Sequence, residues 1–122
     1  MDPNEIRLER TDDSVVVASL AGEHDIYTAP TLRDRMYGVI AEGRPLVVDL
    51  THATFVDSSI LGALLGARRR AHEAGLGFAV CCQEGMDPGV RRILDVTGLV
   101  PVLPVVADRE AAFDAVRSAP AA

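Results

Sequence analysis

The segment 57–59, Asp-Ser-Ser, contains the side chains of this 122-residue sequence that are best placed to take part in chemistry. It follows the apolar run 46–50, which is typical of a buried strand, and it precedes a helical pattern that ends near Gly75. The hydroxyl of Ser58 is therefore expected at a helix N-terminus, where backbone N–H groups and the helix dipole favour negative charge. A phosphoryl group added to Ser58 would be well placed, so we interpret this residue as a switch and not as a catalytic group.

Other roles for this segment remain open. Asp57, Ser58 or Ser59 could be the N-cap of the helix, since Asp and Ser are ordinary capping residues. Asp57 could also orient the hydroxyl of Ser58 or face the magnesium ion of a kinase. A serine hydrolase would need a Gly-x-Ser-x-Gly turn or a convergent set of Ser, His and Asp, and the sequence around Ser58 provides neither. We therefore expect that the protein is not an enzyme.

The composition excludes several classes of function. The net charge of −6 disfavours nucleic acid or an anionic membrane as the main partner, because both require a basic surface. Lysines and arginines together number 12, and all 12 are arginines. The chain therefore lacks the lysine that Walker-type phosphate loops and Schiff-base enzymes use. The sequence shows no secretory signal and no apolar segment long enough to span a bilayer. We therefore expect a cytoplasmic protein.

Neither a metal ion nor a cofactor is expected. His24, His52 and His72 show no ligand spacing, and the two cysteines do not converge with them in the sequence. Cys81 and Cys82 are adjacent in an apparent strand, where neighbouring side chains point to opposite faces of the sheet. Two buried thiols in a reducing compartment are therefore expected in place of a disulfide.

The pattern of the chain predicts one domain over residues 1–118 and a frayed tail over 119–122. Strands are predicted at 6–10, 15–20, 46–50, 77–82 and 102–106, and helices over 28–43, 58–74 and 88–98 and from Asp108 onward. Strands that alternate with helices indicate the α/β class, with an antiparallel pair at the start.

The predicted helix 58–74 separates into two faces when its residues are placed at 100° intervals. The face expected to lie on the sheet comprises Ile60, Ala63, Leu64, Ala67, Ala71 and Ala74. The opposite face carries Ser58, Gly62, Leu65 and Arg69, flanked by Leu61 and His72. Exposed leucines beside glycines indicate a contact surface for a partner protein, although a neighbouring helix would cover Leu61 and Leu65 equally well. The run Arg68-Arg69-Arg70 is most simply a solvated helix face.

Two glycines in this helix call for a compensating contact. Gly62 and Gly66 each destabilise a helix by roughly 1 kcal/mol relative to Ala. The close approach of another backbone would explain them, either within the domain or from a partner.

Several segments together resemble motifs of the anti-sigma-factor antagonists, the bacterial members of the STAS-domain family. Segment 55–62, Phe-Val-Asp-Ser-Ser-Ile-Leu-Gly, resembles the signature of that family, with Ile60 where glycine is usual. Segment 22–25, Gly-Glu-His-Asp, resembles its Gly-Glu-Leu-Asp turn, segment 47–50 its central strand, and segment 90–98 its third helix. The resemblance covers nearly the whole chain. It implies a single STAS-like domain with a mixed sheet of four to five strands and about four helices packed mainly on one face.

The resemblance also implies a mechanism. The unphosphorylated family member binds an anti-sigma factor, often a serine kinase that uses ATP, and so releases a sigma factor for RNA polymerase. The kinase inactivates its antagonist by phosphorylating one serine, which by its place in the motif is Ser58 here, and a phosphatase reverses this step. The residues expected to contact the partner are Asp25, Asp57, Ser59, Leu61, Gly62, Leu65 and Arg69. We expect a monomer or a weak dimer.

Two other functions remain open at this stage. Ile60 in place of the usual glycine favours a STAS scaffold or sensory module that acts in a signalling assembly without direct control of a sigma factor. A small enzyme with Ser58 as its nucleophile is the other alternative.

Overall fold

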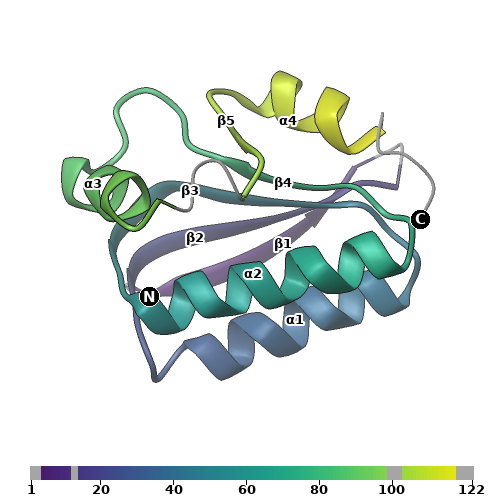
Figure 1. The fold of residues 1–122 in the computed structure, drawn as a ribbon, viewed down its shortest axis with the longest axis horizontal. Coiled ribbons are helices and arrows are strands. Elements are labelled where there is room, and N and C mark those ends of the chain that lie inside the picture. The colour runs from purple at the N-terminus through teal and green to yellow at the C-terminus, as the bar shows by residue number, and fades with distance from the viewer. Residues whose placement is uncertain (1–3, 12–13, 99–102, 118–122) are drawn as a thin grey trace.

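Five strands and four helices make up the part of the chain that the computed structural model describes, residues 4–11, 14–98 and 103–117 (Figure 1). In chain order they are β1 (Glu5–Arg10), β2 (Val16–His24), α1 (Ala29–Ala41), β3 (Leu46–Val56), α2 (Ser58–Glu73), β4 (Phe78–Cys81), α3 (Pro88–Val96), β5 (Val105–Val106) and α4 (Arg109–Arg117). The strands form one sheet in the order β1-β2-β3-β4-β5. β1 is antiparallel to β2 and the other pairs are parallel, so the predicted mixed α/β sheet is confirmed.

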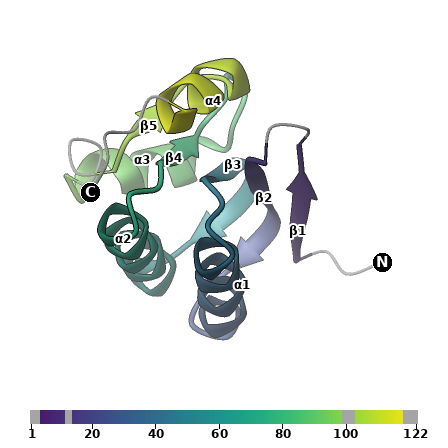
Figure 2. The same ribbon diagram turned by 90° about the vertical axis from the view of Figure 1, so that its right-hand side faces the viewer.

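The central strands are apolar on both faces because helices cover both faces. α1 and α2 lie side by side on one face and α4 covers the other (Figures 1 and 2). The larger core lies on the α1 and α2 side, where Leu32 and Leu64 meet the sheet, and Leu94 of α3 joins it. The smaller core joins the opposite face of the sheet to Ala112 and Val116 of α4. The prediction that the helices pack mainly on one face is therefore confirmed.

The two cysteines lie in different cores. Cys81 belongs to the core beneath α4 and Cys82 to the larger core, which confirms that the two side chains point to opposite faces. Both are free thiols. Burial raises the pKa of Cys81 to about 12 and that of Cys82 to about 11, so both thiols stay protonated and unreactive near neutral pH.

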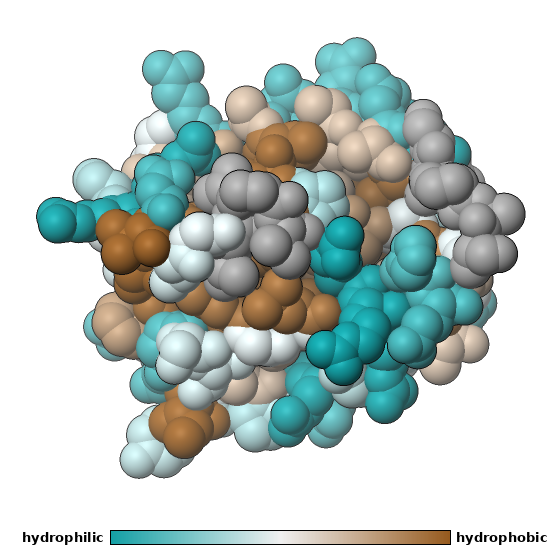
Figure 3. All heavy atoms as spheres, in the orientation of Figure 1, coloured by the Kyte–Doolittle hydropathy of each residue, from teal (hydrophilic) through white to brown (hydrophobic). Residues whose placement is uncertain are grey.

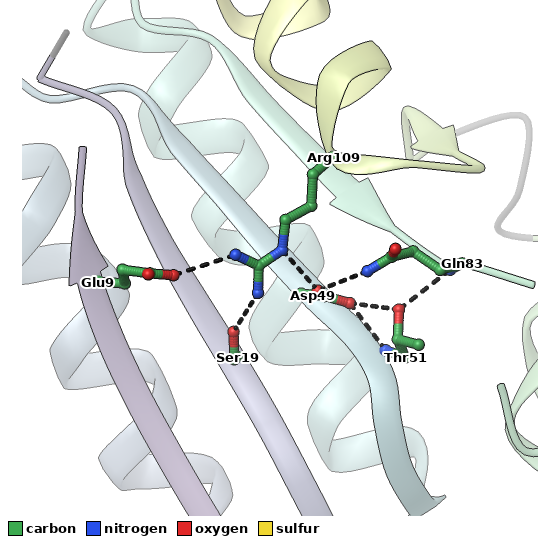
Figure 4. A network of polar contacts seen from close by, with 6 residues as sticks. All are labelled: Glu9, Ser19, Asp49, Thr51, Gln83 and Arg109. Atoms are coloured by element: carbon green, nitrogen blue, oxygen red, sulfur yellow. Dashed lines mark hydrogen bonds and ion pairs between the residues drawn. The ribbon is translucent and has the colours of Figure 1, made fainter. Parts of the chain in front are cut away.

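A polar network beneath α4 fastens that helix to the sheet (Figure 4). Asp49 is 1% exposed, and its Oδ2 lies 3.1 Å from Nε of Arg109, the first residue of α4. The same guanidinium donates to Oε2 of Glu9 at 3.0 Å and to Oγ of Ser19 at 3.2 Å. Thr51 donates to the other carboxylate oxygen of Asp49. Because the network joins three strands to α4, it compensates the buried charge and fixes where the helix starts.

Several predicted boundaries and one predicted face differ from the structure. β2 and β3 continue to His24 and Val56, six residues beyond the predicted end of β3, because the two strands stay paired after the apolar pattern has ended. β5 contains only Val105 and Val106, and the start of the strand predicted at 102–106 lies outside the described residues, as does the tail 119–122. Ala74 is exposed at the end of α2, so its predicted burial is wrong.

The approach of α4 to the loop before β4 leaves no room for a side chain at Gly77. A Cβ at this position would lie 2.2 Å from the carbonyl oxygen of Val116 and 2.4 Å from its Cα. Gly77→Ala should therefore lower the free energy of unfolding by about 3 kcal/mol, as measured by urea denaturation. Gly38→Ala is the matched control, because a Cβ at Gly38 in α1 meets nothing within 4 Å. It should raise the same free energy by about 0.5–1 kcal/mol. Equal effects of the two substitutions would contradict this packing.

Candidate functional site

The junction between β3 and α2 consists of one residue, Asp57. Its backbone is extended, with φ −122° and ψ −175°, and its side-chain Oδ1 accepts hydrogen bonds from the N–H of Ser59 at 2.9 Å and of Ile60 at 3.3 Å. Asp57 is therefore the N-cap of α2. This geometry decides the alternative left open by the sequence, because neither Ser58 nor Ser59 is the capping residue.

The hydroxyl of Ser58 lies exposed in the first turn of α2. Its side chain makes no hydrogen bond with any other residue in the described part of the chain. Ile60, two residues further along, is fully buried in the larger core. The side chain of Ile60 therefore points away from the surface and does not restrict the approach of another protein to Ser58.

The parallel pairing of β2 with β3 brings a second acidic residue to the same end of the sheet. His24 is paired with Val56, so Asp25 and Asp57 follow two neighbouring strands directly at their carboxyl ends. Oδ1 of Asp25 accepts from the N–H of Tyr27 at 2.9 Å, and its carbonyl oxygen accepts from the N–H of Ala29 at 2.9 Å. Asp25 therefore shapes the turn into α1 and adds a second negative charge to this end of the molecule.

A buried histidine holds that turn in place, which the sequence did not indicate. His24 is fully buried, with Nε2 2.9 Å from the carbonyl oxygen of Ala21 and Nδ1 3.2 Å from Oγ1 of Thr28. Because a carbonyl oxygen can only accept, Nε2 carries a proton and donates it to Ala21, while the Thr28 hydroxyl lies within hydrogen-bond distance of both Nδ1 and the carbonyl oxygen of Asp25. The same hydroxyl accepts from the N–H of Asp25 at 3.0 Å. Thr28 is at the N-cap position of α1, but its side chain makes no capping hydrogen bond, since these contacts occupy it.

Three large apolar side chains are exposed at the same end of the sheet, and sequence reasoning missed them. Ile26 is 64% exposed, Tyr27 88% and Phe55 43%. Figure 3 shows hydrophobic surface at this end, where β2 leads into α1. We group these three side chains with Ser58 and the exposed Gly62 under the name Ser58 surface, because the paired strands β2 and β3 end at this level. Within this group Tyr27 lies on the side toward β1, where it lines a hollow with Ile6 and Arg35. The available signal was the pair 26–27, two apolar residues that lie in a turn and fit no strand or helix periodicity.

The outer face of α2 is more buried than predicted. Leu61 is only 4% exposed and belongs to the larger core, so the expectation of an exposed Leu61 is wrong: its position between the two predicted faces turns it inward against the neighbouring elements. Leu65 is half-buried and Arg69 is exposed. These two residues line a shallow hollow of about 300 Å³ with Arg68 and His72.

The two helical glycines have different surroundings. A Cβ at Gly66 would lie 2.8 Å from the hydroxyl of Tyr37, so this glycine allows α1 to approach α2 closely. A Cβ at Gly62 meets nothing within 4 Å. The domain itself therefore accounts for Gly66 but not for Gly62, which leaves the latter available to a partner.

Comparison with known proteins identifies the family. The STAS domain profile matches residues 6–112. This chain belongs to the STAS domain family. An anti-sigma F factor antagonist of Paenibacillus polymyxa is 33% identical to it over 93 residues, which cover 75% of this chain and 77% of the relative. These findings confirm the resemblance carried by the sequence motifs.

Solved structures of anti-sigma factor antagonists share the fold. An anti-sigma factor antagonist from Mycobacterium paratuberculosis matches with a TM-score of 0.81 and 32% identity, over 94% of this chain and 95% of the other. The anti-sigma factor antagonist SpoIIAA in its unphosphorylated form matches with a TM-score of 0.77 and 27% identity, over 93% of this chain and 96% of the other. The phosphorylated form of Bacillus SpoIIAA matches with a TM-score of 0.67 and 26% identity, over 90% and 97%.

Two further observations describe the STAS domain of this chain. Within residues 4–11, 14–98 and 103–117, no helix combines the length and apolar character needed to cross a membrane. The same residues contain no group of three His, Cys, Asp or Glu side chains arranged to hold a metal ion.

Capping by Asp57 separates the structural role of this residue from that of Ser58. Asp57→Ala should lower the free energy of unfolding by about 1 kcal/mol, because it removes the acceptor for two N–H groups of α2. Ser58→Ala should change it by less than about 0.5 kcal/mol, because the exposed hydroxyl has no partner among the described residues. Urea denaturation of both variants measures the difference. A larger loss for Ser58→Ala would reverse the assignment of the cap.

Proposed function

We propose that this STAS protein is an anti-sigma-factor antagonist that phosphorylation of Ser58 switches off. The observation that carries the proposal is an exposed hydroxyl without a hydrogen-bond partner among the described residues, at the start of α2 and within the motif by which the chain resembles this family. The names of its relatives support the general function, and the existence of SpoIIAA in phosphorylated and unphosphorylated forms supports a phosphoryl switch.

In the unphosphorylated protein, the Ser58 surface binds the anti-sigma factor. Tyr27, Ile26 and Phe55 offer apolar area that the domain leaves uncovered, and aromatic side chains dominate the energetics of protein interfaces. Gly62 permits close approach to the backbone of α2. The remaining contact residues of this proposal surround these groups: Asp25, Asp57, Ser59, Leu65 and Arg69. Leu61 is omitted from the contact set because it is buried.

Phosphorylation obstructs docking while the fold is retained. A phosphoryl group adds about −1.5 to −2 charges at neutral pH. The N–H groups of Ser59 and Ile60 are already hydrogen-bonded to Asp57, so they do not fold the phosphate back onto the helix. The phosphate therefore projects into the Ser58 surface beside the carboxylates of Asp57 and Asp25. There its bulk and its desolvation cost oppose the apolar contacts of the partner, and its charge repels acidic groups.

The partner in this proposal is an anti-sigma factor of the serine-kinase type, which binds ATP and phosphorylates the antagonist that it binds. A phosphatase returns the protein to its binding form, and all three proteins act in the cytoplasm. The burial of Ile60 supports the antagonist over the scaffold alternative, because this side chain does not obstruct Ser58.

Phosphorylation in vitro tests the switch. The protein is mixed with each kinase-type anti-sigma factor encoded in its source genome and with ATP, and the phosphoryl group is located by mass spectrometry. One phosphoryl group on Ser58 is expected, and the modified protein should lose affinity by at least about 100-fold in isothermal titration calorimetry. Ser58→Ala should remain bound in the presence of ATP, because it cannot be modified.

Two outcomes would contradict this mechanism. Phosphate on Ser59 alone would contradict the assignment of Ser58 as the phosphorylation site. Undiminished binding by the protein phosphorylated on Ser58 would exclude phosphorylation as the switch, although Ser58 would remain the phosphorylation site.

The apolar part of the Ser58 surface is tested independently of ATP. Tyr27→Ala should weaken binding of the same anti-sigma factor about 10-fold or more, because it removes the most exposed aromatic side chain. Tyr27→Phe is the matched control and should bind within about threefold of the wild type, since it keeps the ring. The free energy of unfolding should stay within about 0.5 kcal/mol in both variants. Equal binding by Tyr27→Ala and the wild type would exclude this residue from the interface.

A further inference from the structure

The second half of α2 carries positive charge that the domain does not neutralise. Arg68 and Arg69 are exposed, and neither forms an ion pair with a residue in the described part of the chain. On the far edge of the sheet, by contrast, Arg7 pairs with Glu5 at 3.3 Å and Arg10 with Glu42 at 2.9 Å. The chain is acidic, with a net charge of −6, so carboxylate partners are plentiful elsewhere.

The composition of α2 explains why these arginines lack partners. The helix contains Arg68, Arg69, Arg70 and one acidic residue, Glu73, a net charge of +2 with histidine neutral. Arg70 has a structural role, because its guanidinium lies 4.0 Å from the centre of the Tyr37 ring on α1. No contact within the described domain gives Arg68 and Arg69 such a role. Figure 3 shows the resulting hydrophilic surface over the C-terminal half of α2.

This basic surface is continuous with the Ser58 surface. Arg69 follows Ser58 by 11 residues, close to three turns, so the two lie on the same face of α2, roughly 16 Å apart. The half-buried Leu65 lies between them along the helix and lines a hollow together with Arg68, Arg69 and His72. A partner that covers Ser58 and extends along α2 therefore reaches the arginines. At that separation a phosphate on Ser58 is beyond direct contact with them and is largely screened at physiological salt.

We propose that Arg68 and Arg69 bind an acidic surface of the anti-sigma factor and set the rate at which it associates. This inference rests on the proposed function. Unpaired charges on an exposed helix accelerate encounters with a partner of opposite charge, whereas the apolar contacts at the Ser58 surface hold the complex together. The interface then has two separable parts. The arginines determine how often the partner arrives and respond to salt, and Ser58 determines how long it stays and responds to phosphorylation.

Binding kinetics of charge-neutralised variants test this division. The variant R68Q/R69Q is compared with R7Q/R10Q, which changes the net charge from −6 to −8 equally but on strand β1, at the other edge of the sheet from α2 (Figure 2). Association with the anti-sigma factor is followed by stopped-flow fluorescence at low and at high salt. R68Q/R69Q should associate about fivefold more slowly than the wild type at low salt, with little change in the dissociation rate constant. The difference should shrink at high salt, and R7Q/R10Q should stay within about twofold of the wild type.

The outcomes separate this proposal from the proposed function. Equal association rates for the two double variants, with binding still lost on phosphorylation of Ser58, would overturn the arginine site and leave the switch intact. If the unmodified wild-type protein bound no kinase-type anti-sigma factor, both proposals would fail. Binding of a double-stranded DNA fragment that R68Q/R69Q abolished would replace the acidic protein partner with nucleic acid and would also overturn the proposal.

Discussion

The parallel pairing of β2 with β3 is the constraint on which the candidate site depends. Because the two strands remain paired as far as His24 and Val56, both chains leave the sheet at the same edge and at the same level. β2 leads into the turn that contains Asp25, Ile26 and Tyr27, and β3 leads into Asp57 and the start of α2. Ligand and partner sites of sheets with parallel strands commonly form at this edge, where successive loops converge. Parts of the Ser58 surface that are 30 residues apart in the chain are thereby brought together.

Each of the two chain segments at this edge is fixed by its own polar anchor. Asp57 satisfies the first turn of α2 through its side chain, and the contacts of His24 with Ala21 and Thr28 hold the turn before α1. On the opposite face the network around Asp49 fixes α4. Every buried polar side-chain atom in the described residues has a hydrogen-bond partner, so the polar groups inside the fold are matched. The exposed apolar side chains of the Ser58 surface and the arginines without an ion pair, Arg68 and Arg69, lie on the surface.

Local sequence patterns predicted the parts of this structure that local physics determines. The apolar runs located the central strands, the helical periodicity placed Ile60 and Leu64 inward, and the motif 55–62 identified the family. The continuation of β3 to Val56 could not be predicted in this way, because polar residues interrupt its pattern while pairing with β2 maintains the strand. The burial of His24 and the ion pair between Asp49 and Arg109 join residues from separate elements, and no spacing along the chain encodes them. Leu61 was misplaced for the same reason, since only the packing of neighbouring elements decides which flank of a helix is covered.

The capping of α2 by Asp57 has a consequence for the turnover of the protein. The cap does not involve the hydroxyl of Ser58, so under the proposed switch a phosphoryl group on that hydroxyl would break none of the hydrogen bonds that start the helix. Cellular proteases act on chains that have opened, at a rate set by the open population. Phosphorylation would then not expose the free domain to proteases, and any difference in turnover between the two forms would come from the partner, which protects only the form that it binds.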